Sequence, residues 1–470
     1  MSNSRSPGSR DPGPKSQPPR RKRAILDYLP RKQVRTGMAA MADQVVCSAT
    51  NFLTGIMIGR ACSKTEFGAY SLGMSIVLLL GAFQAGIILT PYMIRIPRLN
   101  GDVRNQYTGS ILVHEAALCA LAVVCLAVIA GVLVGTGARE LVPVISSLAA
   151  VVPFLLLREH ARQVCFARLQ MGAALALDCC VGAAQLTGLT LLAYHGQLSA
   201  VWACWSLGAA NLLAVSIWAF WFRGQTVLRP AQVLVDLRSN WSFGKWVFAS
   251  SMIWALVTYL SPWILVSFHG TASAGIWAAC LGTVSFVNPL VVGVQNFIGP
   301  TIAHACVQND YASPRRHAVK AAAVSALILA PVALTLFIFG GSLAAIIYGD
   351  KYAGNGLIIA GLTLSVLLGA TDFAFSRVLY AFHRANWDSL ANLSGLLMFG
   401  LAGVWLMHAY GPLGTALALL LYTTTAMTVR LGVFVRLTRP QAVRIVPAAS
   451  QIPPAGLTPA VSLEDSASMP

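Results

Sequence analysis

Residues 116–134 read AALCALAVVCLAVIAGVLV, a stretch without a charged or amide side chain. A helix needs about 20 such residues to cross the hydrocarbon core of a bilayer. Apolar residues follow one another here, without the alternation of apolar and polar residues that marks a strand of a membrane barrel. Backbone in lipid must satisfy its own hydrogen bonds, so the stretch predicts a membrane-spanning helix.

The whole chain has the composition of a protein with many such helices. Of its 470 residues, 56% are hydrophobic and 10% are charged, whereas a soluble domain has roughly 25% charged residues. The mean hydropathy is +0.68. We predict an all-α integral membrane fold with about twelve transmembrane helices. The expected spans are residues 37–59, 68–94, 108–134, 141–165, 172–194, 198–222, 243–268, 272–303, 318–347, 354–379, 386–408 and 412–435.

The basic residues set the predicted topology, because Lys and Arg in short loops stay on the cytoplasmic side of a membrane. If the N-terminus is inside, the outside loops keep only 4 of the 33 basic residues: Arg60, Lys64, Arg139 and Lys351. We therefore expect both chain ends in the cytoplasm. The net charge of +17 is then explained by topology and by contact with anionic lipid headgroups, and not by nucleic acid.

The predicted spans divide into two halves. Residues 36–222 form an N-lobe of six spans and residues 243–436 form a C-lobe of six spans, with the polar residues 223–242 as a cytoplasmic linker. Residues 1–35 and 437–470 are rich in small or polar residues and Pro, without an apolar period. Such composition predicts disordered cytoplasmic tails, the first of them basic.

The two halves share a short sequence echo. Phe67-Gly-Ala-Tyr opens the second predicted span, and Ala274-Gly-Ile-Trp opens the eighth. Each follows a long span and a short outside turn. Parallel repeats of this kind are typical of transporters, whose substrate sites lie between the lobes.

Motifs for enzymatic chemistry are not found in the sequence. It has no glycine-rich phosphate loop ending in Lys-Ser or Lys-Thr and no His-Glu-x-x-His zinc motif. The ten cysteines have no metal-ligand spacing. The outside loops are short, whereas membrane glycosyltransferases and polysaccharide polymerases generally carry a sizeable external loop. We expect a protein that is not an enzyme and that binds no metal or cofactor.

Charged residues within the spans are the main candidate site residues. The carboxylates Asp43, Glu115, Asp178 and Asp372 lie about one to two turns in from the cytoplasmic ends of their spans. An ionised carboxylate facing lipid costs at least about 2.5 kcal/mol, so each should face the bundle or a wet cavity. They could form a proton or cation site or contact polar substrate groups. They could equally pair with nearby arginines, for example Asp372 with Arg377.

Other polar residues of the predicted spans also allow two interpretations of their role. Arg158 and Arg162 are four residues apart and share a helix face, where they could grip a phosphate or serve only to fix topology. Gln84, Gln295 and Asn296 lie deep in the second and eighth spans. Their amides could bridge helices or contact sugar hydroxyls.

Several segments resemble a known family. Residues 42–60 (ADQVVCSATNFLTGIMIGR) and 66–72 (EFGAYSL) are similar to the opening of bacterial polysaccharide transporters, the O-antigen flippase-like branch of the MOP exporter superfamily. The later segments FARLQ from Phe166 with Leu177-Asp178, YGDKYAG from Tyr348 and YGPLGTA from Tyr410 are also similar. The resemblance covers most of residues 36–436.

The resemblance implies two six-helix lobes around a central cavity, in the bacterial inner membrane. It implies a flippase that moves a polyprenyl-diphosphate-linked oligosaccharide to the outer leaflet by alternating access, for O-antigen or exopolysaccharide synthesis. Other polysaccharide-assembly proteins would be its partners, together with membrane lipids. Asp43, Asn51 and Arg60 match the opening positions of that family.

Two other functions stay open. An ion-coupled multidrug or small-solute antiporter could have the same architecture. A membrane-embedded glycan polymerase or ligase is the alternative from the enzyme class. The sequence does not identify the sugar or the coupling ion.

Overall fold

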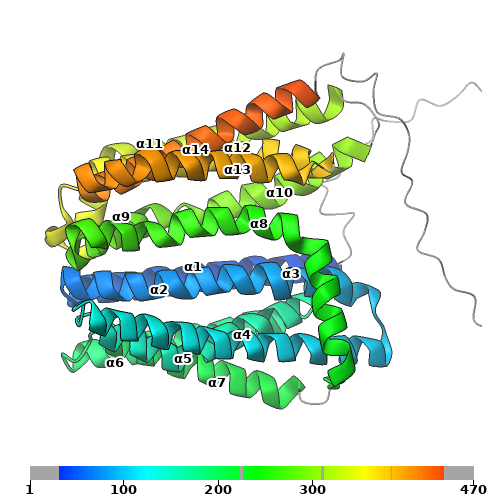
Figure 1. Cartoon of the computed structure of the whole chain (residues 1–470), viewed down its shortest axis with the longest axis horizontal. Coiled ribbons are helices and arrows are strands. Elements are labelled where there is room, and N and C mark those ends of the chain that lie inside the picture. The colour runs from blue at the N-terminus through cyan, green and yellow to red at the C-terminus, as the bar shows by residue number, and fades with distance from the viewer. Residues whose placement is uncertain (1–30, 223–225, 308–311, 383, 439–470) are drawn as a thin grey trace, which may run out of the picture. The chain divides into compact units, whose positions relative to one another are not determined.

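The computed structural model describes residues 31–222, 226–307, 312–382 and 384–438. In this part of the chain every regular element is a helix, and none is a strand. The predicted all-α fold is therefore confirmed. The chain forms two compact units, and long helices run through each of them (Figure 1).

Unit 1 comprises the described residues of Met1–Met57 and Ile87–Asn240. Helix α5 is its centre and packs against α3, α4, α6 and α7. Tyr92, Ile111 and Cys165 are fully or almost fully buried in its core. The elements are α1 (Arg31–Ala61) as far as Met57, α3 (Thr90–Arg95), the 3-10 helix η3 (Ile96–Arg98), α4 (Gly101–Gly135), α5 (Val142–Ala167), α6 (Met171–Tyr194), α7 (Ala200–Phe222) and the first turns of α8 (Pro230–His269).

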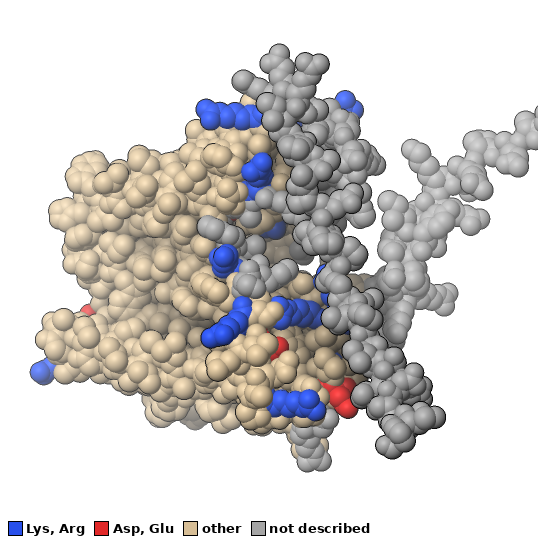
Figure 2. Space-filling view, turned by 45° about the vertical axis from the view of Figure 1, so that its right-hand side comes forward, with Lys and Arg blue, Asp and Glu red and all other residues tan. Residues whose placement is uncertain are grey.

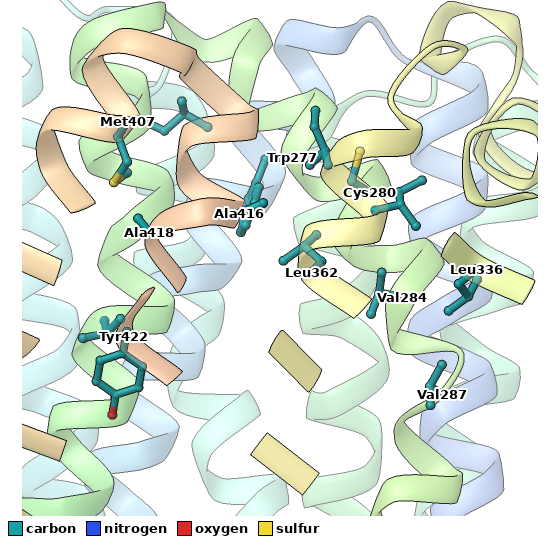
Figure 3. Packing of buried hydrophobic residues seen from close by; sticks show 14 of the residues in the cluster. Trp277, Cys280, Val284, Val287, Leu336, Leu362, Met407, Ala416, Ala418 and Tyr422 are labelled. Atoms are coloured by element: carbon teal, nitrogen blue, oxygen red, sulfur yellow. The ribbon is translucent and has the colours of Figure 1, made fainter. Parts of the chain in front are cut away.

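Unit 2 comprises Ile58–Gly86 and the described residues of Trp241–Pro470. Its main core includes Trp277, Leu362 and Met407 (Figure 3). The elements are the end of α1, α2 (Lys64–Gln84), the start of the π-helix η2 (Ala85–Leu89), the rest of α8, α9 (Thr271–Ser285), α10 (Asn288–Val307), α11 (Ala312–Tyr348), the 3-10 helix η4 (Asp350–Tyr352), α12 (Gly356–Ala381), α13 (Ala385–Met398), the π-helix η5 (Phe399–Gly403) and α14 (Val404–Leu437). The units are defined by spatial contacts, and the predicted lobe boundaries at 222 and 243 stay a prediction.

The helices are long and apolar enough for a multi-pass membrane protein. Nine described helices can cross a bilayer by length and composition, or ten if α9 and α10 form one bent span. Helix α4 shows the expected surface, since Leu121, Val124 and Val128 are more than half exposed although they are apolar. Such a face suits lipid and not water. Most of the surface drawn in Figure 2 is uncharged.

The last candidate span, Asn386–Leu437, has 52 residues. At 1.5 Å per residue it would extend about 78 Å, far more than the roughly 30 Å hydrocarbon core. The backbone breaks at Gly411, which has φ 57° and ψ −130° and precedes Pro412. Tyr422, beyond the break, packs back on Gly395 of α13. The segment is therefore a hairpin, as the predicted spans 386–408 and 412–435 require, while the total of about twelve stays a prediction.

Two glycines let α2 and α9 cross in close contact. A Cβ at Gly68 would lie 2.1 Å from the carbonyl oxygen of Thr271, and a Cβ at Gly275 would lie 2.0 Å from that of Lys64. Each carbonyl belongs to the residue four positions before the glycine of the other helix, so the contact is reciprocal. Backbones this close gain Cα–H···O contacts. These glycines belong to the echoed tetrapeptides, which therefore meet in space.

Substitution of Gly68 by Ala is expected to destabilise this crossing by about 1–3 kcal/mol, because the new methyl group forces the two backbones apart. Thermal unfolding of the purified protein in detergent measures the effect. Gly81→Ala is the matched control on the same helix, since no atom lies within 4 Å of a Cβ built there. Equal melting temperatures for the two variants would show that the close contact does not stabilise the protein.

Candidate functional site

A buried group of charged residues occupies unit 1, and we name it the unit 1 charge cluster. Helix α5 supplies its basic residues on one face, as their four-residue spacing predicts, and α1 and α6 supply the two aspartates. Asp43 is fully buried and Asp178 is 2% exposed. The members are Asp43, Cys47, Arg158, Glu159, Arg162 and Asp178.

Arg162 bridges the two aspartates of this cluster. Its Nη2 lies 2.6 Å from Asp43 Oδ2, and its Nε lies 2.9 Å from Asp178 Oδ2. Arg158 donates to Asp178 Oδ1, and the Cys47 thiol donates to Asp178 Oδ2 at 2.8 Å. Charge-assisted contacts of this kind hold buried charges that would otherwise be costly. The sequence-predicted residues Asp43, Arg158, Arg162 and Asp178 thus form one network.

The charge balance of the cluster suits a proton. The carboxylates of Asp43, Glu159 and Asp178 face only two guanidinium groups, and among the described residues no donor reaches Asp43 Oδ1. One carboxylate oxygen of Asp43 and one of Asp178 lie within 4.8 Å of each other, so a proton bound to either carboxyl group would lie near both. One bound proton would then make the cluster neutral.

The same cluster offers three possible metal ligands. One oxygen each of Asp43 and Asp178 and the sulfur of Cys47 lie within 4.8 Å of one another. However, the two guanidinium groups already neutralise these oxygens and would repel a cation. The donor set therefore fits a proton better than a metal ion.

Glu115 of α4 lies in a second buried pair of unit 1. Its Oε2 is 3.6 Å from His160 Nδ1, and both side chains are fully buried. The imidazole also contacts the rings of Tyr92 and Trp218. A protonated imidazole would be ion-paired with the carboxylate, so the pair is a further candidate proton site.

Unit 2 has its own buried group, the unit 2 charge cluster, centred on Arg430 of α14. Arg430 is 5% exposed. Its Nε lies 2.8 Å from Asp388 Oδ1, its Nη2 lies 2.9 Å from Asn392 Oδ1, and its Nη1 donates to Asp372. One guanidinium group therefore lies between two carboxylates.

The expected pairing of Asp372 with Arg377 is wrong. Residues five apart on a helix do not share a face, whereas neighbours three or four apart do. The Arg377 guanidinium instead lies over the rings of Phe373 and Tyr380, at 4.2 and 5.2 Å from their centroids. Asp372 finds its partner 58 residues away along the chain, in Arg430.

Arg60 caps the C-terminal end of a helix. Its guanidinium donates to the carbonyl oxygens of Ile346 and Ile347, at the last turn of α11. In return the Lys351 ammonium donates to the carbonyl oxygens of Arg60 and Cys62, where α1 ends. Basic side chains stabilise helix C-termini by satisfying carbonyls that lack a helical partner. Arg60, at the end of α1, thus caps α11, and Lys351, which follows α11, caps α1.

The other predicted residues do not join these groups. Asn51 is exposed on α1, Gln84 is buried at the end of α2, and Gln295 is half-buried in α10. Asn296 lies in the same helix, and its side chain is outside the described residues.

Sequence reasoning missed His160, Asp388, Asn392 and Arg430. A signal was available for Arg430, because it lies inside the predicted span 412–435, where an arginine needs a buried partner.

Residues 100–355 of the chain match the family model described as "Polysaccharide biosynthesis protein". No curated protein sequence matches the chain.

Solved structures of similar fold are transporters. An inward-facing multidrug resistance MATE family transporter of the MOP superfamily has a TM-score of 0.70 at 11% identity, covering 86% of this chain and 100% of that one. The lipid II flippase MurJ, in an inward closed conformation, has a TM-score of 0.68 at 12% identity, covering 85% and 87%. A MOP superfamily transporter from Pyrococcus furiosus has a TM-score of 0.59 at 11% identity, covering 86% and 94%. These similarities confirm the predicted MOP-type fold.

Proposed function

The chain belongs to the polysaccharide biosynthesis protein family, and we propose that it is a flippase for a polyprenyl-diphosphate-linked oligosaccharide. It would move this intermediate from the cytoplasmic to the outer leaflet of the bacterial inner membrane, for O-antigen or exopolysaccharide synthesis. Its partners would be the lipid-linked glycan, membrane lipids and other polysaccharide-assembly proteins.

The family match carries this proposal, because it covers more than half of the chain, from residue 100 to residue 355. The MOP-type fold supports transport as the role of a family member without a recognised catalytic motif. A glycan on a lipid carrier must be moved across the membrane before it can be used outside. A transporter fold within a polysaccharide family is consistent with that step.

The unit 1 charge cluster is the proposed coupling site. Three carboxylates face two arginines there, so binding of one proton changes the net charge from negative to neutral. Such a change can bias a two-state protein only if the two states bind the proton with different affinity. We propose that Asp43 and Asp178 supply this difference as the lobes alternate.

The proposed orientation places both chain ends in the cytoplasm. The predicted outside loops keep only 4 of the 33 basic residues, and the positive-inside rule assigns the loops that hold the others to the cytoplasmic side. Residues 226–240, which end unit 1 and lead into unit 2, would then lie in the cytoplasm.

Depletion of the protein is expected to trap a complete lipid-linked repeat unit on the cytoplasmic side. Mass spectrometry of lipid-linked oligosaccharides, with and without a membrane-impermeant glycosidase added to intact cells, measures its amount and side. Re-expression of the wild-type chain should restore the normal pool.

The other outcomes separate the rivals. An unchanged pool together with lost ion-coupled uptake of a fluorescent cation into vesicles would replace the proposal with an antiporter. A repeat unit that accumulates on the outer side, with altered chain length, would indicate a polymerase or ligase.

A further inference from the structure

The start of α8 is bound to unit 1 by polar contacts. Val227 N–H donates to the Asn105 carbonyl at 3.1 Å, just before the helix begins. The His114 ring lies 2.9 Å from the Val233 carbonyl, and Tyr107 donates to Asn240 at 2.9 Å. In Figure 1 these first turns run across the ends of the other unit 1 helices. Residues 227–240 are therefore held along more than two turns of α4.

The segment of residues 227–240 buries two polar residues and exposes large apolar ones. Asp236 is 9% exposed and Asn240 is 1% exposed, whereas Leu228, Leu234 and Val235 are 58% to 69% exposed. The exposed Arg229 and Arg238 flank the apolar side chains. Apolar and basic residues on one outward face are typical of a helix that lies in the membrane interface.

A cavity of about 250 Å³ lies between this segment and the turn from α3 to α4. Two arginines line it, Arg95 and Arg98, with the amides of Gln106 and Gln232 and the carboxylate of Asp236. Leu99 and Val103 add an apolar wall. All of these residues belong to unit 1.

The charged groups that line the cavity keep hydrogen-bonding capacity that contacts within the protein do not fill. Among the described residues, no donor reaches the buried Oδ2 of Asp236, and the Arg98 side chain is exposed. Arg95 gives one nitrogen to Ser239 and lies 5.9 Å from the centroid of the Tyr107 ring. A buried carboxylate oxygen without a donor is costly, which points to a ligand that brings one.

We infer that this cavity binds the headgroup of a membrane lipid, a phosphate ester that also carries hydrogen-bond donors. The phosphate fits Arg95 and Arg98, which offer charge-assisted hydrogen bonds to its oxygens. Hydroxyl or ammonium donors fit Asp236 and the two glutamines. The apolar wall and the exposed leucines continue toward the lipid chains. A metal ion does not fit, because one carboxylate faces two guanidinium groups.

Two lipids share this chemistry, an abundant phospholipid and the sugar phosphate of a lipid-linked glycan. The cavity has room for one headgroup or one sugar and not for an oligosaccharide. The inference rests on the membrane location of the chain. It holds whether or not the chain exports a glycan.

Native mass spectrometry of the purified full chain tests the inference. The probes are phosphatidylglycerol, phosphatidylethanolamine, phosphatidylcholine and a polyprenyl phosphate carrying one hexose. We expect a bound lipid with donors on its headgroup and weak binding of phosphatidylcholine, which has none. Arg98→Gln and Asp236→Asn should each weaken the bound lipid about tenfold, the usual effect of losing one charge-assisted hydrogen bond. Neither change should unfold the protein, because Arg98 is exposed and Asn keeps the volume of Asp.

Arg229→Gln is the matched control, since this arginine is exposed on the same segment and does not line the cavity. Its binding should equal that of the wild type. Preferred binding of the hexose lipid would assign the cavity to the glycan carrier, and preferred binding of a glycerophospholipid would assign it to the bulk membrane. Equal binding of all four lipids, or equal losses in Arg98→Gln and Arg229→Gln, would overturn the inference. Because binding is measured without export, its failure is distinct from failure of the flippase proposal.

Discussion

Replacing Asp178 by Asn is expected to reduce glycan export to a tenth of the wild-type rate or less, while expression stays normal. Asn keeps the shape of the side chain and removes its ability to take up a proton. A tenfold loss corresponds to about 1.4 kcal/mol, less than the usual cost of disturbing a buried charged hydrogen bond. Asp43→Asn should behave in the same way, because Arg162 bridges the two carboxylates. The amount of lipid-linked repeat unit that reaches the outer leaflet measures the effect.

A matched control separates coupling from the loss of any carboxylate in unit 1. Asp102 is exposed at the start of α4 and lies outside the cluster, so Asp102→Asn should retain export. If Asp178 only balances charge, the double variant Arg158→Gln with Asp178→Asn would restore export by removing both charges. If Asp178 carries the proton, the double variant stays inactive. Normal export in both single Asn variants would eliminate the cluster as the coupling site.

Replacing Arg430 by Met is expected to destabilise the protein by about 3–5 kcal/mol. The change removes the guanidinium that Asp372, Asp388 and Asn392 share. Breaking a buried ion pair on one side leaves an uncompensated charge, and here two carboxylates lose their partner. Denaturant or thermal unfolding in detergent measures the loss. Arg436→Met is the control on the same helix, because Arg436 is exposed, and it should unfold like the wild type.

Neutralising the acidic partners should recover much of the loss of stability. The triple variant Arg430→Met, Asp372→Asn, Asp388→Asn leaves no unpaired charge, and apolar or neutral replacements of whole buried ion networks are often well tolerated. If Arg430→Met alone unfolds like the wild type, the unit 2 charge cluster contributes no stability.

Much of the fold could be predicted because its cause is local. The run at residues 116–134 is apolar on every side of a helix. Such a run is stable as a membrane-spanning helix, because its backbone then satisfies its own hydrogen bonds in lipid. The predicted spans 386–408 and 412–435 agree with the break that the structure shows at Gly411, before Pro412. The spacing of Arg158 and Arg162 placed both guanidinium groups on one face of α5, where both contact Asp178.

Pairings between distant residues could not be predicted in this way. Asp372 was assigned to a nearby arginine, yet its partner is Arg430, and Glu115 meets His160 of another helix. The hydropathy pattern indicates that a charged residue within a span needs a partner, but it does not indicate which helix supplies that partner. The rotation of each helix about its axis and the packing of its neighbours choose the partner.

The sequence by itself determined that this chain is a helical membrane protein, and its short motifs indicated a polysaccharide family, since hydropathy and short motifs act within one segment. Only the tertiary structure decided which buried charges share a site, that the echoed glycines of α2 and α9 touch, and that residues 227–240 close a cavity over Arg95 and Asp236. The physical reason is the distance along the chain over which each kind of interaction acts. Hydrophobic length and helix geometry are set within about 20 residues, whereas ion pairs, close backbone contacts and cavities depend on residues that only packing brings together.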